Sequence, residues 1–285
     1  MFPSAFAYHR PASVAEAVAL IGANPDAKVL AGGHSLIPAM KLRLAMPEAL
    51  IDLNRIDALR GISVDGEVTI GAMTTYAQLL DDAGLGERFA VIHDAADHVG
   101  DVQVRARGTL GGSIAHSDPA SDFTAVMLAL GARVTAVGPD GERTIGADDL
   151  FVDLFTTALR PDELLTRITL PAVAGTVVTA YAKHAHPASG YPVVGIAAML
   201  TMGGGTVSAA RIAVTGATSK ATRLMAAEAV LTGQKIDDAA IDRAAAAAPE
   251  GLEINGDGYA SEEYRRHLVS VLTGRVIRQA VARAG

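Results

Sequence analysis

Two glycine-rich segments in the first half of the chain have the residue types that bind an anion. They are Gly32-Gly33-His34-Ser35 and Thr109-Leu110-Gly111-Gly112-Ser113. Paired glycines permit positive φ and let successive backbone N–H groups converge on one anion, and the positive end of a following helix adds to the attraction. Neither segment fits the six-residue dinucleotide fingerprint or the Walker pattern, and either pair alone is more often a tight turn at a sheet edge. Together they predict a cradle for a diphosphate.

Metal and nucleophile chemistry have less support. Three pairs invite a metal-site interpretation: His184 with His186, His93 with His98, and His116 with Asp118. Each pair lacks a third ligand at metal-binding spacing, and no Gly-x-Ser-x-Gly nucleophile elbow is present. With Cys 0, the chain has no thiolate for an iron–sulfur cluster, a zinc ribbon or a cysteine nucleophile. We therefore predict no metal site in this chain.

Composition and charge narrow the class of protein further. Lys+Arg 24 against Asp+Glu 31 gives a net charge of −7, so binding to nucleic acid is not expected. The sequence shows no basic segment followed by an apolar stretch at its start and no long uninterrupted apolar run. These features predict a cytoplasmic protein without a membrane span.

The elements that must position the glycine segments fall into three parts. In residues 1–57, Ser13 and Glu16 form a capping-box pattern for a helix that ends at Gly22. Strands are predicted there over 28–30 and 49–53, with a short helix over 36–43. In residues 58–174, Asp65-Gly66 predicts a hairpin over 62–70. The other elements predicted in this part are helices over 76–80, 88–99 and 122–130 and strands over 132–137, 144–145 and 165–170.

Residues 175–285 predict strands followed by helices. The strands are expected over 176–183, 193–202 and 206–214, and the helices over 221–231, 236–248 and 261–283. Such a layer of strands and then helices is typical of an α+β domain.

The two glycine segments and their surroundings resemble the flavin-binding medium subunit of molybdenum hydroxylases, the carbon monoxide and xanthine dehydrogenase family. The motifs that carry the likeness are Ala31–Pro38, Lys41-Leu42-Arg43, Thr69–Thr75, Gln103-Val104-Arg105, Gly108–Ser113 and Pro119–Asp122. The resemblance implies a two-lobed PCMH-type FAD-binding fold, with a small N-terminal α/β lobe and a larger mixed α+β lobe. A C-terminal domain with a three-stranded sheet and helices follows, and the predicted parts are 1–57, 58–174 and 175–285.

The resemblance also implies which residues contact FAD. They are Ala31, Gly32, Gly33, His34, Ser35, Leu36, Gly71, Ala72, Gly108, Thr109, Gly111, Gly112, Ser113, Asp122, Leu165 and Lys183. Asp122 resembles the acid that hydrogen-bonds the ribityl or adenosine part, although it is also a natural N-cap for the helix over 122–130. Lys183, in Tyr181-Ala182-Lys183, resembles the lysine near the flavin ring, where a cation favours the reduced anionic flavin. Lys183 and Tyr191 are the predicted catalytic residues.

The segment after Lys183 departs from the family pattern. Many relatives have an arginine and then Gly-Asp-Phe-Ala, whereas this chain has His184-Ala-His-Pro-Ala-Ser-Gly-Tyr-Pro-Val193. Tyr191 covers the face of the isoalloxazine in one interpretation and is an ordinary loop tyrosine in the other. The departure leaves the electron acceptor open between NAD, quinone, oxygen and other small molecules.

The resemblance implies an oxidoreductase subunit that transfers electrons through FAD. A large subunit is expected to carry molybdopterin and a small subunit the [2Fe-2S] clusters, in a heterohexameric dimer of heterotrimers that reduces a small-molecule acceptor. Two alternatives are a stand-alone FAD-dependent oxidase, in which His34 carries a covalent flavin, and a binding module that has lost its flavin.

Overall fold

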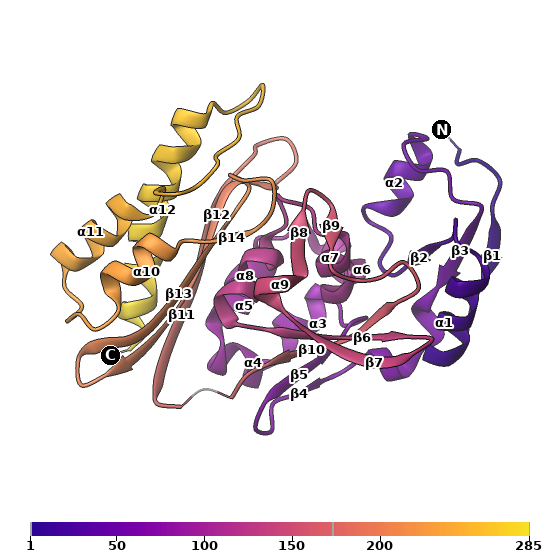
Figure 1. Cartoon of the computed structure of the whole chain (residues 1–285), viewed down its shortest axis with the longest axis horizontal. Coiled ribbons are helices and arrows are strands. Elements are labelled where there is room, and N and C mark those ends of the chain that lie inside the picture. Colours follow the sequence, from indigo (N-terminus) through magenta and orange to yellow (C-terminus); the bar gives the residue numbers. More distant parts are fainter. Residues whose placement is uncertain (1, 173, 285) are drawn as a thin grey trace.

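The protein is described by a computed structural model over residues 2–172 and 174–284. A small N-terminal lobe, a central lobe and a C-terminal domain follow one another along the longest axis (Figure 1). The mixed sheets and helices confirm the predicted α+β class. No described helix is long and apolar enough to cross a membrane.

A parallel sheet with strand order β1-β3-β2 forms the first lobe. Its elements are β1 (Ala7–His9), α1 (Val14–Ala23), β2 (Lys28–Leu30), α2 (Leu36–Lys41) and β3 (Ala49–Asp52). Ser13 caps α1 as predicted, because its hydroxyl accepts a hydrogen bond from Glu16 N at 3.1 Å. The carboxylate of Glu16 accepts from Ala12 N at 2.8 Å, one residue before the partner that a capping box requires. Strand β1 was not predicted, since it is short and largely exposed.

The central lobe contains an antiparallel sheet with strand order β4-β5-β10-β6-β7. These strands are β4 (Ile62–Ser63), β5 (Val68–Gly71), β6 (Arg133–Gly138), β7 (Gly141–Gly146) and β10 (Leu164–Leu170). The short 3-10 helices η1 (Leu53–Arg55) and η2 (Asp57–Leu59) lead into the lobe, and a small hairpin pairs β8 (Phe151–Asp153) with β9 (Thr156–Thr157). The predicted hairpin around Asp65-Gly66 is present as β4 and β5, with Gly66 at a φ of +73°.

The described part of the central lobe also contains seven helices, of which α7 and α9 contact strands of this sheet. They are α3 (Tyr76–Asp81), α4 (Ala83–Arg88), α5 (Ala90–Asp97), α6 (Val102–Arg107), α7 (Leu110–His116), α8 (Asp122–Leu130) and α9 (Ala147–Leu150). The single helix predicted over 88–99 is wrong, because Phe89 leaves the helical region and separates α4 from α5. Every residue of α8 is buried, since this helix contacts β12 and β13 of the C-terminal domain as well as α5 and α7.

The C-terminal domain has a four-stranded antiparallel sheet rather than the predicted three strands. Its elements are β11 (Thr176–Ala185), β12 (Pro192–Gly203), β13 (Thr206–Thr215), β14 (Thr222–Arg223), α10 (Met225–Leu231), α11 (Asp238–Ala247) and α12 (Glu262–Ala282). Thr222–Arg223 pairs with β13, so the helix predicted from residue 221 begins only at Met225. Helices α5 and α8 cover one face of the sheet, and α10 and α12 cover the other (Figure 1). Because both faces are covered, β12 is apolar almost without interruption.

Candidate functional site

The first glycine loop joins β2 to α2 and leaves its backbone donors unused. Gly33 has a φ of +78°, in the left-handed region that glycine adopts without strain. Within the described chain, the N–H groups of residues 32–35 donate no hydrogen bond to another group. The ring of His34 is exposed, and its Nδ1 lies 3.2 Å from Gly32 O. The loop therefore offers several free backbone donors to an anion.

The second glycine pair does not form the expected turn with positive φ. Gly111 and Gly112 lie in the first turn of α7, which Thr109 caps, and neither has a positive φ. Their N–H groups are already used, since Gly111 donates to Ala72 O at 2.9 Å and Gly112 to the Thr109 hydroxyl at 3.2 Å. A Cβ on Gly111 would lie 2.5 Å from Ala72 Cβ. Glycine is required here for close packing, so this segment is a wall beside the first loop rather than a second nest of free donors.

The two glycine segments touch each other across the boundary between the first two lobes. A Cβ on Gly32 would lie 2.2 Å from Arg107 O, and one on Gly112 would lie 3.5 Å from Ala31 Cβ. Within the first lobe, Asn54 of η1 holds the same loop, because its side-chain amide donates to Ala31 O at 3.3 Å. The first two lobes therefore meet at the residues that the sequence singled out.

Three more of the predicted residues are closely packed in the central lobe. Gly71 packs directly against the backbone of η2, since a Cβ on Gly71 would lie 2.3 Å from Leu59 O. Gly108 lies under Tyr76, whose ring atom Cε2 would be 2.6 Å from an added Cβ. Leu165 is buried in the core of the central lobe, at a bulge in β10. Ser113, in contrast, remains partly exposed and shares a 2.6 Å hydrogen bond with Ser121.

A buried ion pair links the central lobe to the C-terminal domain. Lys183 Nζ lies 2.8 Å from Asp122 Oδ1, and the exposed fractions of the two side chains are 2% and 5%. The hydroxyl of Tyr181 donates to the same carboxylate oxygen at 2.7 Å, and Lys183 also donates to His98 O at 2.9 Å. Burial raises the pKa of Asp122, and the Lys183 ammonium and the Tyr181 hydroxyl oppose that rise. Lys183 is thus a cation whose partner is fixed within the chain.

Asp122 does not cap α8, because Ser121 is the N-cap residue and Asp122 is the first residue of the helix. Its carboxylate is instead held by Lys183 and Tyr181. The interpretation of Asp122 as an N-cap is therefore wrong. Its predicted contact with the cofactor stays a prediction.

Tyr191 lies on the hairpin between β11 and β12 and is 48% exposed. Burial of its hydroxyl raises the pKa of Tyr191, as does the carboxylate of Asp118, and the Ser35 hydroxyl opposes the shift. These neighbours bring the C-terminal hairpin, the end of α7 and the first glycine loop to one place. No local sequence pattern indicates that these segments meet, since the three are far apart along the chain.

Residues 4–173 match the family described as the FAD binding domain in molybdopterin dehydrogenase, and residues 167–280 match the C-terminal domain of the CO dehydrogenase flavoprotein. The chain belongs to the FAD-binding medium subunits of molybdenum hydroxylases.

Relatives of this medium subunit span its whole length. It is 41% identical to the carbon monoxide dehydrogenase medium chain of Afipia carboxidovorans, over 100% of this chain and 99% of the relative. It is 36% identical to the nicotine 6-hydroxylase medium subunit of Paenarthrobacter nicotinovorans, over 98% of each chain. The structure of the carbon monoxide dehydrogenase from Hydrogenophaga pseudoflava that lacks the Mo-pyranopterin moiety matches with a TM-score of 0.96 and 42% identity, over 100% of both chains. These matches confirm the predicted oxidoreductase family, the PCMH-type fold and FAD as the cofactor.

The residues of the medium subunit fit FAD at the first glycine loop. The free N–H groups of residues 32–35 suit the oxygens of a diphosphate, and Gly33 permits the backbone conformation that exposes them. No group of three or more potential metal ligands is present among the described residues. The contacts of the individual residues with FAD stay predictions.

Two contacts, one at the first glycine loop and one at Asp122, were not predicted from the sequence. Asn54, which donates to Ala31 O, carries no local signal of that role. The bond of Tyr181 with Asp122 had a partial signal, because residues 181 and 183 lie on the same face of a strand and so approach the same partner.

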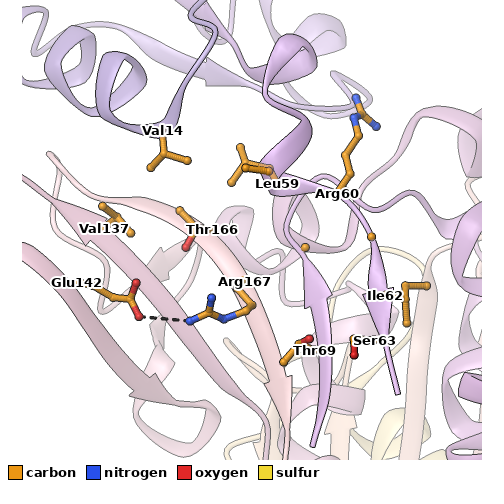
Figure 2. Close-up of a pocket in the computed structure, with 13 residues that line it drawn as sticks. Val14, Leu59, Arg60, Ile62, Ser63, Thr69, Val137, Glu142, Thr166 and Arg167 are labelled. Carbon is orange, nitrogen blue, oxygen red and sulfur yellow. Dashed lines mark hydrogen bonds and ion pairs between the residues drawn. The ribbon is translucent and has the colours of Figure 1, made fainter. Parts of the chain in front are cut away.

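A separate cavity of about 460 Å³ lies between the first lobe and the sheet of the central lobe. Figure 2 shows Val14 and Leu59 on one side and Thr166 and the ion pair of Glu142 with Arg167 on the other. Of the predicted cofactor residues only Gly71 lines it. Its walls do not include the loop of residues 32–35, so the cavity is distinct from the first glycine loop.

Proposed function

We propose that this medium subunit passes electrons from iron–sulfur clusters on a small subunit through its FAD to an external small-molecule acceptor. In the proposed complex, a large subunit carries the molybdopterin at which the substrate is oxidised. The observation that carries the proposal is the first glycine loop, whose free backbone donors lie beside Tyr191 and the wall formed by α7. The medium chains and subunits among the relatives support assembly with larger and smaller partners.

The residues of the chain have distinct parts in this proposal. The N–H groups of Gly33, His34 and Ser35 bind the diphosphate, and α7 packs behind it. FAD, when bound, supplies the two-electron redox chemistry. Lys183, fixed by Asp122, would supply a cation near the ring, and Tyr191 would cover the ring. Asp122 in turn limits the influence of that cation, because the two charges largely cancel at a distance.

Two separate parts of the surface carry exposed apolar side chains suited to contacts with partner subunits. The exposed apolar side chains of α2 and the segment after it are Ile37, Leu42, Leu44 and Met46, and those of the C-terminal domain include Met225, Tyr259 and Tyr264. Exposed apolar groups of this kind are typical of protein interfaces. We propose that the partners contact parts of the first lobe and the C-terminal domain, in a dimer of heterotrimers.

Acid precipitation of the purified protein is expected to release the yellow colour into the supernatant. The reason is that the proposed binding depends on hydrogen bonds to the diphosphate, which are lost when the chain unfolds. The absorbance of supernatant and pellet at the flavin bands measures the distribution. Colour that stays with the pellet would indicate a covalent flavin and favour the oxidase alternative, with His34 as the attachment site.

Co-expression from the native gene cluster is expected to yield a complex containing molybdenum, iron and two further chains. One chain should be larger and one smaller than this subunit, and light scattering should give two copies of each. The physical reason is that this chain has no cysteine to hold iron–sulfur clusters. If the isolated chain, free of molybdenum and iron, oxidised a small organic substrate at about 10 s⁻¹, the stand-alone oxidase would replace the subunit proposal.

A further inference from the structure

We propose that Arg265 is a positioning residue that holds the Tyr191 hairpin and the segment before Asp122 in place at the flavin site. Arg265 lies in the first turns of α12, away from the glycine loops, and is only 8% exposed. The proposal rests on the proposed function, because it assigns Arg265 an effect on the bound flavin.

The guanidinium of Arg265 joins three separate segments. Its Nη1 donates to Gly216 O, at the end of β13, and to Val193 O at 3.3 Å, in β12. Its Nη2 is paired with the carboxylate of Asp257 in the loop before α12. Val193 is two residues from Tyr191, so the bond to its carbonyl restrains the end of the hairpin that carries Tyr191.

The segment that contains Gly216, whose carbonyl Arg265 binds, also contacts the central lobe. Gly216 has a φ of +82°, and its N–H donates to Pro119 O at 2.7 Å. The hydroxyl of Thr215 lies 2.6 Å from Pro119 O and 2.8 Å from Ser121 O, and its one proton is shared between these two carbonyls. Asp122 follows directly, with its carboxylate on Lys183. A displacement of Gly216 would therefore shift the segment of residues 119–121 and, through it, the ion pair of Asp122 with Lys183.

Arginine suits this position better than lysine. A planar guanidinium presents several donors in a fixed fork, so it can bind two carbonyls and a carboxylate at once. A buried cation also requires partners, and Asp257 supplies the opposite charge. Hydrogen bonds to a charged group contribute more than neutral ones.

The test compares Arg265→Met, Arg265→Lys and the neighbouring control Arg266→Met in the purified complex. Arg266 is exposed and bonds only to Pro249 O among the described residues, at 3.1 Å. The readouts are the dissociation constant of FAD, its visible circular dichroism and its midpoint potential. We expect Arg265→Met to weaken FAD binding about tenfold, equivalent to about 1.4 kcal/mol, and to change the visible spectrum. Arg265→Lys should restore part of both, and Arg266→Met should change neither.

A further variant keeps the proposal testable if Arg265→Met fails to fold. Asp257→Asn removes the charge partner of Arg265 at a half-exposed position, and we expect a change in the same direction of about two- to threefold. The proposal fails if these variants lower the melting temperature but leave the affinity, spectrum and potential of FAD unchanged. A wild-type complex without FAD would instead contradict the proposed function, so the two failures are distinguishable.

Discussion

Replacing Lys183 with Met is expected to destabilise the chain by about 3–5 kcal/mol at neutral pH. The variant removes the cation 2.8 Å from Asp122 Oδ1 and leaves that carboxyl buried, with Tyr181 as its remaining side-chain donor. Unfolding in urea, followed by far-UV circular dichroism, measures the loss. Lys235→Met is the matched control, because Lys235 is exposed and its replacement should cost less than about 0.5 kcal/mol.

The loss should depend on pH in a defined direction. Burial raises the pKa of Asp122, and removing Lys183 takes away the main opposing charge. Below the pKa of an unfolded Asp, about 3.9, the carboxyl is protonated in both the folded and the unfolded chain. Its burial then lowers the free energy of unfolding least. As the pH rises towards the raised folded value, the unfolded chain releases the proton first, so the free energy of unfolding falls. Adding Asp122→Asn to the variant should remove this pH dependence and recover part of the stability.

The same variant is expected to lower the two-electron potential of the bound flavin by tens of millivolts, since about 30 mV corresponds to roughly 1.4 kcal/mol. Loss of a nearby cation disfavours the reduced anionic flavin. Spectroelectrochemical titration of the complex gives the potential, and Lys235→Met should leave it unchanged. An unchanged potential in Lys183→Met would place the ammonium away from the ring.

Gly32→Val is expected to abolish retention of FAD. A Cβ at this position would lie 2.2 Å from Arg107 O, so the loop must move away from the end of α6 and lose the geometry of its free N–H groups. The ratio of flavin to protein, from the absorbance of the purified chain, is expected to fall at least tenfold, with little change in far-UV circular dichroism. A tenfold increase in the dissociation constant of FAD corresponds to about 1.4 kcal/mol.

Two further glycine variants test whether close packing at the glycine segments explains the expected loss of FAD. Gly111→Val should act in the same way by pushing α7 from Ala72, which an added Cβ would approach to 2.5 Å. Gly203→Val is the matched control, because nothing lies within 4 Å of a Cβ there and the φ is not positive. Full occupancy of FAD in both Gly32→Val and Gly111→Val would show that the two segments are ordinary structural contacts.

Much of the local structure could be predicted because neighbouring residues determine it. The cap at Ser13, the hairpin at Asp65-Gly66 and the strands of the C-terminal domain depend on hydrogen bonds and side-chain alternation within a few residues. The family was also evident from motifs that are short and continuous, such as Ala31–Pro38.

Predictions from local patterns were wrong where distant segments compete for the same backbone. Gly111 and Gly112 suggested a turn, since glycine disfavours helices. In the structure Thr109 caps the segment and Ala72 accepts from Gly111 N, so the glycines begin α7. Strand β14 was missed because its two residues are defined only by pairing with β13.

By itself the sequence determined the family, the α+β class and the glycine turn at residues 32–35, because each depends on contiguous residues. Only the tertiary structure decided that Asp122 pairs with Lys183, that Tyr191 lies near Ser35, and that Arg265 joins the ends of β12 and β13. The physical reason is that a buried charge is stable only where the fold brings its partner within a few ångströms. The distance between two charged partners in the fold cannot be predicted from their spacing along the chain.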